Sequence, residues 1–72
     1  MNERQMQNAL HNLIENLIDA QRHDKDIEMP DGMGEFGQVH DFAEAVLLAS
    51  NKGLVITMKD GSEFQVTIVQ SH

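Results

Sequence analysis

The chain has 72 residues, no cysteine, and a formal net charge of −7 from 12 acidic and 5 basic side chains. A chain of this length forms one domain, residues 1–72, whose small core is marginal without a partner, and it has no disulfides or cysteine-ligated zinc. The negative charge argues against direct binding to nucleic acids or anionic membranes. The sequence shows no leader and no apolar run of about 20 residues, so we expect a cytoplasmic protein.

The first predicted element is a helix from Asn2 to about Lys25. Asn2 and Gln5 are expected to form a weak cap at its start. The apolar stripe lasts about three heptads, which favours a core-facing helix or a short dimer seam over a long coiled coil. The apolar residues recur every three or four positions, as on one face of a helix: Met6, Leu10, Leu13, Ile14, Leu17, Ile18 and Ala20.

A long glycine-rich loop is predicted for residues 27–40, IEMPDGMGEFGQVH. Periodicity disappears in this segment, and Pro30-Asp31-Gly32 is a turn signal. Loops of about a dozen residues are usually functional or disordered. This loop also carries apolar residues, which predict either a lid on the core or a contact with a partner: Met29, Met33, Phe36 and Val39.

A second helix is predicted from Asp41 to Ala49. Asp41 and Glu44 have the spacing of a capping box, and both are acids at the positive end of the helix dipole. Between Phe42 and Ala49 every residue except Glu44 is apolar, so we expect this helix to be covered on more than one side. Asn51-Lys52-Gly53 supplies a cation and a glycine to end it.

The last predicted element is a β-hairpin. A two-residue Asp60-Gly61 loop would place the apolar rows of its two strands on opposite faces. A three-residue loop, Lys59-Asp60-Gly61, with Gly61 left-handed, instead pairs Ile56 with Phe64. This register puts six apolar residues on one buried face: Leu54, Ile56, Met58, Phe64, Val66 and Ile68. The opposite face is mixed, and we expect it to face solvent: Val55, Thr57, Glu63, Gln65 and Thr67.

The predicted fold class is therefore α+β, in the order helix, long glycine-rich loop, helix, strand, strand (ααββ). Both helices are expected on the apolar face of the hairpin. A two-stranded sheet is marginal alone, and the second helix and the hairpin carry more apolar surface than one short partner helix covers. We therefore expect a homodimer, formed through sheet edges or through the helices.

No motif predicts catalysis, a cofactor or a metal site. The four histidines lack a recognised ligand spacing, and no serine sits in a nucleophile elbow. The spacing of Asp24, Asp26, Glu28 and Glu35 matches that of a calcium-binding loop, but Met29 occupies the position that needs glycine. The prediction is a non-enzymatic protein with no cofactor.

The acidic residues are concentrated in the middle of the chain. Between Asp24 and Glu44 there are seven acids and one base, Lys25. The simplest interpretation is solubility. The functional interpretation is a small binding or regulatory protein that presents carboxylates to a basic, nucleic-acid-binding surface of a partner protein, in place of phosphates. Small phage-encoded inhibitors act in this way, and this chain is analogous to them in its size, its charge and its lack of a catalytic motif. The predicted partner-binding residues are Asp26, Glu28, Asp31, Met33, Glu35 and Phe36.

Two alternatives belong to other classes of function. In the first alternative, the chain is a structural or accessory subunit of a homo- or hetero-oligomer. Such a subunit folds fully only with its partner. In the second, it is a metal-binding sensor or an enzyme that uses its histidines and acids. The identity of the partner would distinguish the accessory subunit from the inhibitor. A nuclease or polymerase partner supports the inhibitor, and a dedicated cognate subunit supports the accessory subunit.

Overall fold

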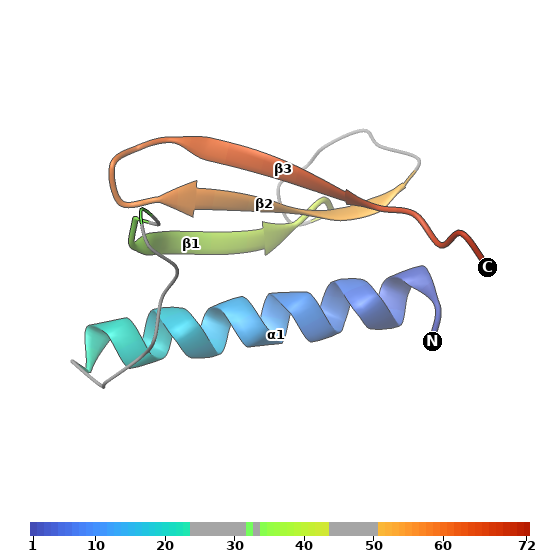
Figure 1. The fold of residues 1–72 in the computed structure, drawn as a ribbon, viewed down its shortest axis with the longest axis horizontal. Coiled ribbons are helices and arrows are strands. Elements are labelled where there is room, and N and C mark those ends of the chain that lie inside the picture. The colour runs from blue at the N-terminus through green and yellow to red at the C-terminus, as the bar shows by residue number, and fades with distance from the viewer. Residues whose placement is uncertain (24–31, 33, 44–50) are drawn as a thin grey trace.

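The computed structural model describes residues 1–23, 32, 34–43 and 51–72. Within this part, the elements are α1 (Glu3–Arg22), β1 (Phe36–Asp41), β2 (Lys52–Met58) and β3 (Glu63–Ile68). The strands form an antiparallel sheet in the order β1-β2-β3. Helix α1 lies along β1, and β3 is the strand farthest from it (Figure 1). The fold is α+β, with the helix against one side of the sheet.

Helix α1 forms where the apolar stripe predicts it. It begins after Asn2, whose side chain accepts a hydrogen bond from the Gln5 amide at 2.8 Å. The Gln5 side chain accepts from the Asn2 amide at 2.8 Å, so the predicted cap is confirmed, and the structure shows that it is a full capping box. Arg22 in the last turn places a cation at the negative end of the helix dipole.

The predicted order of helix, loop, helix and two strands is wrong. In the described residues one helix precedes a three-stranded sheet, because Phe36–Asp41, predicted as loop and helix start, forms β1. Asp41 pairs with Leu54 instead of beginning a helix, and the Phe42 amide donates to the Gly53 carbonyl at 3.0 Å. Residues 44–49 of the predicted helix lie outside the described residues, as do residues 27–31 and 33 of the predicted loop.

A β-bulge at Gly37 explains why β1 shows no strand pattern in the sequence. Phe36 pairs with Met58 and Gln38 with Thr57, so two steps along β1 match one step along β2. The extra residue brings Phe36 and Val39 into the same core cluster, although a regular strand would send residues three apart to opposite faces. A Cβ at Gly37 would lie 2.9 Å from the Thr57 carbonyl oxygen, so glycine allows the close approach.

The predicted hairpin register is confirmed. Ile56 pairs with Phe64, and Gly61 has a φ of 93°, the left-handed conformation that the three-residue loop requires. The Met58 amide donates to the Ser62 carbonyl at 2.8 Å, and the Gly61 amide donates to the Met58 carbonyl at 3.1 Å. These two bonds close the loop and fix which side chains of β2 and β3 share a face.

The hydrophobic core lies between α1 and the first two strands. Its buried cluster is Ile18, Phe36, Val39 and Leu54, against which Leu10, Ile14, Leu17, Ile56 and Met58 pack. Within the described residues β3 adds no member to this cluster, since Phe64 is 56% exposed and Val66 37% exposed. The expectation that the hairpin's apolar row is buried along both strands is therefore wrong for Phe64 and Val66, because α1 lies toward β1.

The other face of the sheet also differs from expectation. Val55 was expected to face solvent, but it is buried, as is Phe42 on the same face. The Phe42 ring lies where a Cβ of Gly53 would be, so glycine at this position makes room for the ring. Elsewhere on this face Gln65 and Thr67 are exposed, as expected.

The part of the chain that the structure describes contains no helix with the length and apolar character needed to cross a membrane.

Candidate functional site

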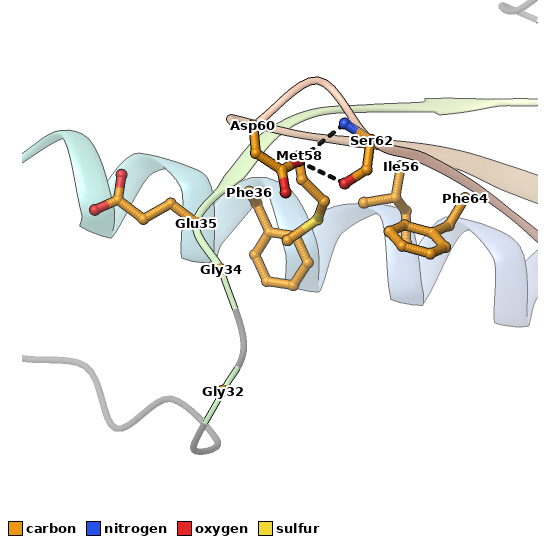
Figure 2. A pocket seen from close by; sticks show the side chains of 9 residues that line it. All are labelled: Gly32, Gly34, Glu35, Phe36, Ile56, Met58, Asp60, Ser62 and Phe64. Carbon is orange, nitrogen blue, oxygen red and sulfur yellow. Dashed lines mark hydrogen bonds between the residues drawn. The ribbon is translucent and has the colours of Figure 1, made fainter.

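A hollow of about 440 Å³ lies between the hairpin turn and the residues that precede β1. Figure 2 shows the side chains of Phe36, Met58, Ile56 and Phe64 in a row along it, with Asp60 and Ser62 on the turn beside them. Gly32, Gly34 and Glu35 also line it. The hollow is referred to below as the turn pocket.

The apolar wall of the turn pocket follows from the register of the sheet. The three-residue loop pairs Ile56 directly with Phe64, and paired residues lie on the same face of the sheet. Met58 is on that face too, because side chains alternate along a strand. The bulge at Gly37 brings Phe36 to the same face, opposite Met58. Phe36 is buried in the core while Phe64 is exposed, so the wall runs from the core to solvent. Such a wall binds an apolar side chain better than a polar one.

Glu35, which lines the pocket, is paired with Lys59 of the hairpin turn. Lys59 Nζ lies 3.0 Å from Glu35 Oε2, and the Lys59 amide donates to the Glu35 carbonyl at 2.9 Å. The backbone bond ties the turn to the residue before β1. Both side chains are more than half exposed, so the ion pair contributes little to stability, but it offsets the charge of Glu35.

Asp60 provides a second carboxylate, on the turn itself. Its Oδ1 accepts from the Ser62 hydroxyl at 2.5 Å and from the Ser62 amide at 2.9 Å. The bond from the Ser62 hydroxyl, followed by the bond from the Ser62 amide, lowers the pKa of Asp60. Both of these bonds end on Oδ1, and neither of them occupies Oδ2. The turn therefore presents an ionised carboxylate with one oxygen available to a cation.

The chemistry of the turn pocket suits binding. Catalysis by a serine needs a base that takes its proton, but Ser62 donates to a carboxylate whose lowered pKa makes it a poor base. Among the described residues that line this pocket there is no histidine. Within the described ranges, no group of three or more His, Asp or Glu side chains is arranged to hold a metal ion.

Two glutamines of α1 position the strands that build the site. The Gln21 side chain donates to the Phe36 carbonyl at 3.0 Å and accepts from the Phe36 amide at 3.3 Å. At the other end of the helix, the buried Gln7 accepts from the Gly53 amide at 3.0 Å. These bonds fix the start of β1 and the start of β2 against α1. In the sequence both glutamines look like ordinary polar residues beside an apolar stripe.

The structure places two of the predicted partner-binding residues, Glu35 and Phe36. Both line the turn pocket, although Phe36 is a buried strand residue and not an exposed loop residue. Asp26, Glu28, Asp31 and Met33 lie outside the described residues, so their role stays a prediction. Three other lining residues were not predicted as site residues: Asp60, Ser62 and Phe64. The hairpin register would have indicated Phe64, since it places that residue beside Ile56.

A second hollow, of about 130 Å³, lies at the opposite end of the molecule, where the start of α1 meets the residues after β3. Its lining includes Met6, Ile68 and Val69. The exposed apolar side chains of β3 therefore lie between two hollows.

Comparison of the chain with protein-family models, with curated proteins and with solved structures finds no match.

Proposed function

We propose that this chain is a small non-enzymatic binding or regulatory protein that docks onto a basic partner protein through the turn pocket. The observation that supports this function is the apolar wall of Ile56, Met58 and Phe64 beside the ionised Asp60 carboxylate. An apolar side chain of the partner enters the pocket, and an adjacent Lys or Arg contacts Asp60. The apolar wall supplies affinity for the partner, and the carboxylate fixes the partner's orientation.

The charge of the whole chain supports a basic partner. A net charge of −7 on 72 residues attracts a positively charged surface from a distance and speeds its encounter. In the sharpest form of the proposal, the partner's surface is one that binds nucleic acid, and the carboxylates of Asp26, Glu28, Asp31 and Glu35 stand in for phosphates. Met33 then adds a second apolar contact. The absence of cysteine fits a cytoplasmic partner.

An accessory subunit is the second candidate function. It is supported by the exposed Phe64 and Val66 of β3, since apolar side chains at a strand edge are often covered in an assembly. A metal sensor or an enzyme is not supported by an observation within the described residues, and we do not propose it.

The test of the proposed function is capture of basic proteins from a lysate of the source on immobilised protein. Wild-type protein is compared with Phe64→Ser, which removes the exposed end of the wall, and with its matched control Val66→Ser on the same face of β3 outside the pocket. We expect a basic protein that wild type and Val66→Ser retain and Phe64→Ser loses. Equal retention on all three would contradict docking in the turn pocket.

The role of the carboxylates is tested by titrating the purified partner at two salt concentrations. Asp60→Asn keeps the oxygen that accepts from Ser62 but removes the charge, and Glu63→Gln is the control on the same hairpin outside the pocket. We expect weaker and less salt-dependent binding by Asp60→Asn than by the control.

The phosphate-mimicking form is tested separately with the quadruple variant that neutralises Asp26, Glu28, Asp31 and Glu35. Mimicry requires loss of binding with the fold intact. If this variant binds as well as wild type at both salt concentrations, the partner does not read these acids as phosphates.

A further inference from the structure

The two edges of the sheet are built differently. At the β1 edge, the side chain of Gln21 bonds both the amide and the carbonyl of Phe36, as a neighbouring strand would. The bulge at Gly37 also interrupts the ladder of that strand. A bulge and bonded backbone groups are two ways in which proteins protect a sheet edge from pairing. The β1 edge is therefore protected at its start.

The β3 edge has neither protection. Its pairing with β2 runs without a register shift from Thr67 to Glu63, and the strand contains no proline and no lysine. Along an antiparallel pair of strands, hydrogen-bonded residue pairs alternate with pairs that are not hydrogen-bonded. Met58 donates to Ser62, so every second residue of β3 counted from Ser62 is hydrogen-bonded to β2. The amides of Phe64 and Val66 therefore point to β2, while those of Glu63, Gln65 and Thr67 point away from it. This edge is a regular template for another strand.

The side chains of β3 also remain uncovered. Phe64 is 56% exposed and Val66 37% exposed, because α1 lies against the β1 side of the sheet. Leu13, on α1, is exposed as well. Exposed apolar side chains next to free backbone amides are the two components of a strand-pairing interface. The β3 edge carries both.

We propose that β3 pairs in antiparallel fashion with β3 of a second copy of this chain, giving a continuous six-stranded sheet. A twofold axis requires a surface that complements itself. With the axis at Val66, Val66 lies beside Val66 of the second copy, and Phe64 lies beside Ile68 of the second copy. All of these side chains fall on one face because strand side chains alternate. The polar Gln65 and Thr67 pair with each other on the opposite face.

The β3 edge itself is almost uncharged, which suits a second copy. Residues 64–71 carry no Asp, Glu, Lys or Arg, although the chain as a whole has a net charge of −7. The acid at the start of the strand, Glu63, lies opposite Val69 of the second copy in this register, so like charges do not meet. A basic protein gains little at such a neutral strand, whereas two copies can pair residues 64–68 there without placing carboxylates directly opposite each other.

Sedimentation equilibrium on the whole chain, from low micromolar to near-millimolar concentration, tests the proposal. We expect the mass to rise from 8.1 kDa to twice that value as concentration increases. Gln65→Pro removes an amide that points away from β2, so it should abolish the rise. Gln65→Ala keeps the amide and should leave the rise unchanged. A single-chain mass throughout, or a dimer that survives Gln65→Pro, would overturn the proposal.

Amide hydrogen exchange separates loss of pairing from loss of folding. The Val66 amide lies within the hairpin, so its protection in Gln65→Pro shows that β2 and β3 remain paired. If this variant fails to fold, the unaltered protein decides the question. Exchange at Gln65 and Thr67 should slow as protein concentration rises, and exchange that is independent of concentration would overturn the proposal. Phe64 belongs to both surfaces, but Asp60 lies outside the paired strand, so the pocket variant Asp60→Asn should dimerise normally and separates the two proposals.

Discussion

Strands β2 and β3 form one hairpin and carry similar apolar rows, yet their side chains meet different surroundings. Leu54 on β2 is 1% exposed, whereas Val66, its partner on β3, is 37% exposed. Ile56 is partly buried, whereas its partner Phe64 is 56% exposed. The difference arises from the position of α1, which covers β1 and β2 and leaves β3 at the far side of the sheet (Figure 1).

This comparison separates two roles of apolar residues. Those of β2 stabilise the fold, because they pack against α1 and β1. Those of β3 are held in place by the hairpin and remain available for contacts outside the chain. Burial in so small a protein is therefore decided by where the single described helix lies, and not by the composition of each strand. Variants of matched residues on the two strands should separate stability from association.

The largest expected effect is that of Leu54→Ala. Truncating this fully buried side chain leaves a cavity in the core, and we expect a loss of about 2–5 kcal/mol in the free energy of unfolding. Val66→Ala, at the paired position, should cost less than about 1 kcal/mol because its side chain is partly in solvent already. Urea denaturation measures both. Equal losses would show that β3 contributes to the core as much as β2 does.

A smaller loss is expected for Gln7→Leu. The Gly53 amide donates to the Gln7 side chain in a buried position, so leucine leaves that amide without its partner. The expected cost is about 1–3 kcal/mol in the free energy of unfolding. Asn8→Leu, at the adjacent exposed position of α1, is the matched control and should change the stability by less than about 0.5 kcal/mol. A similar effect of both changes would indicate that the Gln7 bond does not hold α1 to β2.

The hairpin turn should be sensitive at Gly61. Its φ of 93° is strained for a β-branched residue, so Gly61→Val is expected to cost about 1–3 kcal/mol. Asp60→Ala removes two exposed hydrogen bonds with Ser62 and should cost less than Gly61→Val. Thermal unfolding of the two variants compares them. A larger loss for Asp60→Ala would mean that the side-chain bonds, and not the backbone conformation, hold this turn.

The smallest expected effect concerns acid pH. The bonds from Ser62 lower the folded-state pKa of Asp60. A lowered pKa contributes stability above the unfolded-state value, and that contribution disappears as the pH falls through the folded-state value. Ser62→Ala removes the hydroxyl bond, so the pKa of Asp60 should rise toward its ordinary value. An NMR titration of the Asp60 carboxyl carbon measures it, and an unchanged pKa would contradict the role of the Ser62 hydroxyl.

Local signals were enough to predict α1 and the hairpin. The Asn2 and Gln5 cap, the apolar stripe and the glycine at position 61 each act within a few residues, so the sequence displays them directly. Strand β1 was missed because the bulge spaces Phe36 and Val39 three residues apart, which is not the period of a strand. The acids Asp41 and Glu44 then suggested a helix start, but Asp41 pairs with Leu54 across the sheet.

The candidate site was predictable in part for the same reason. Glu35 and Phe36 were proposed from the composition of their segment, and both line the turn pocket. Asp60 and Phe64 were not proposed, because the pocket depends on the offset of α1 toward β1, which no local pattern shows. Gln7 and Gln21 were missed because a polar side chain that bonds a distant backbone amide has no signal in its own neighbourhood.

One contact in the molecule joins the two ends of the described chain. Glu3 Oε2 accepts from the Gln70 amide at 2.8 Å, across 67 positions of sequence. Figure 1 shows both ends at one side of the molecule, away from the hairpin turn. A short peptide linker between them would therefore give a circular chain with little distortion of the fold. Ring closure restricts the unfolded chain more than the folded one, so the circular protein should resist heat and exopeptidases better than the linear form.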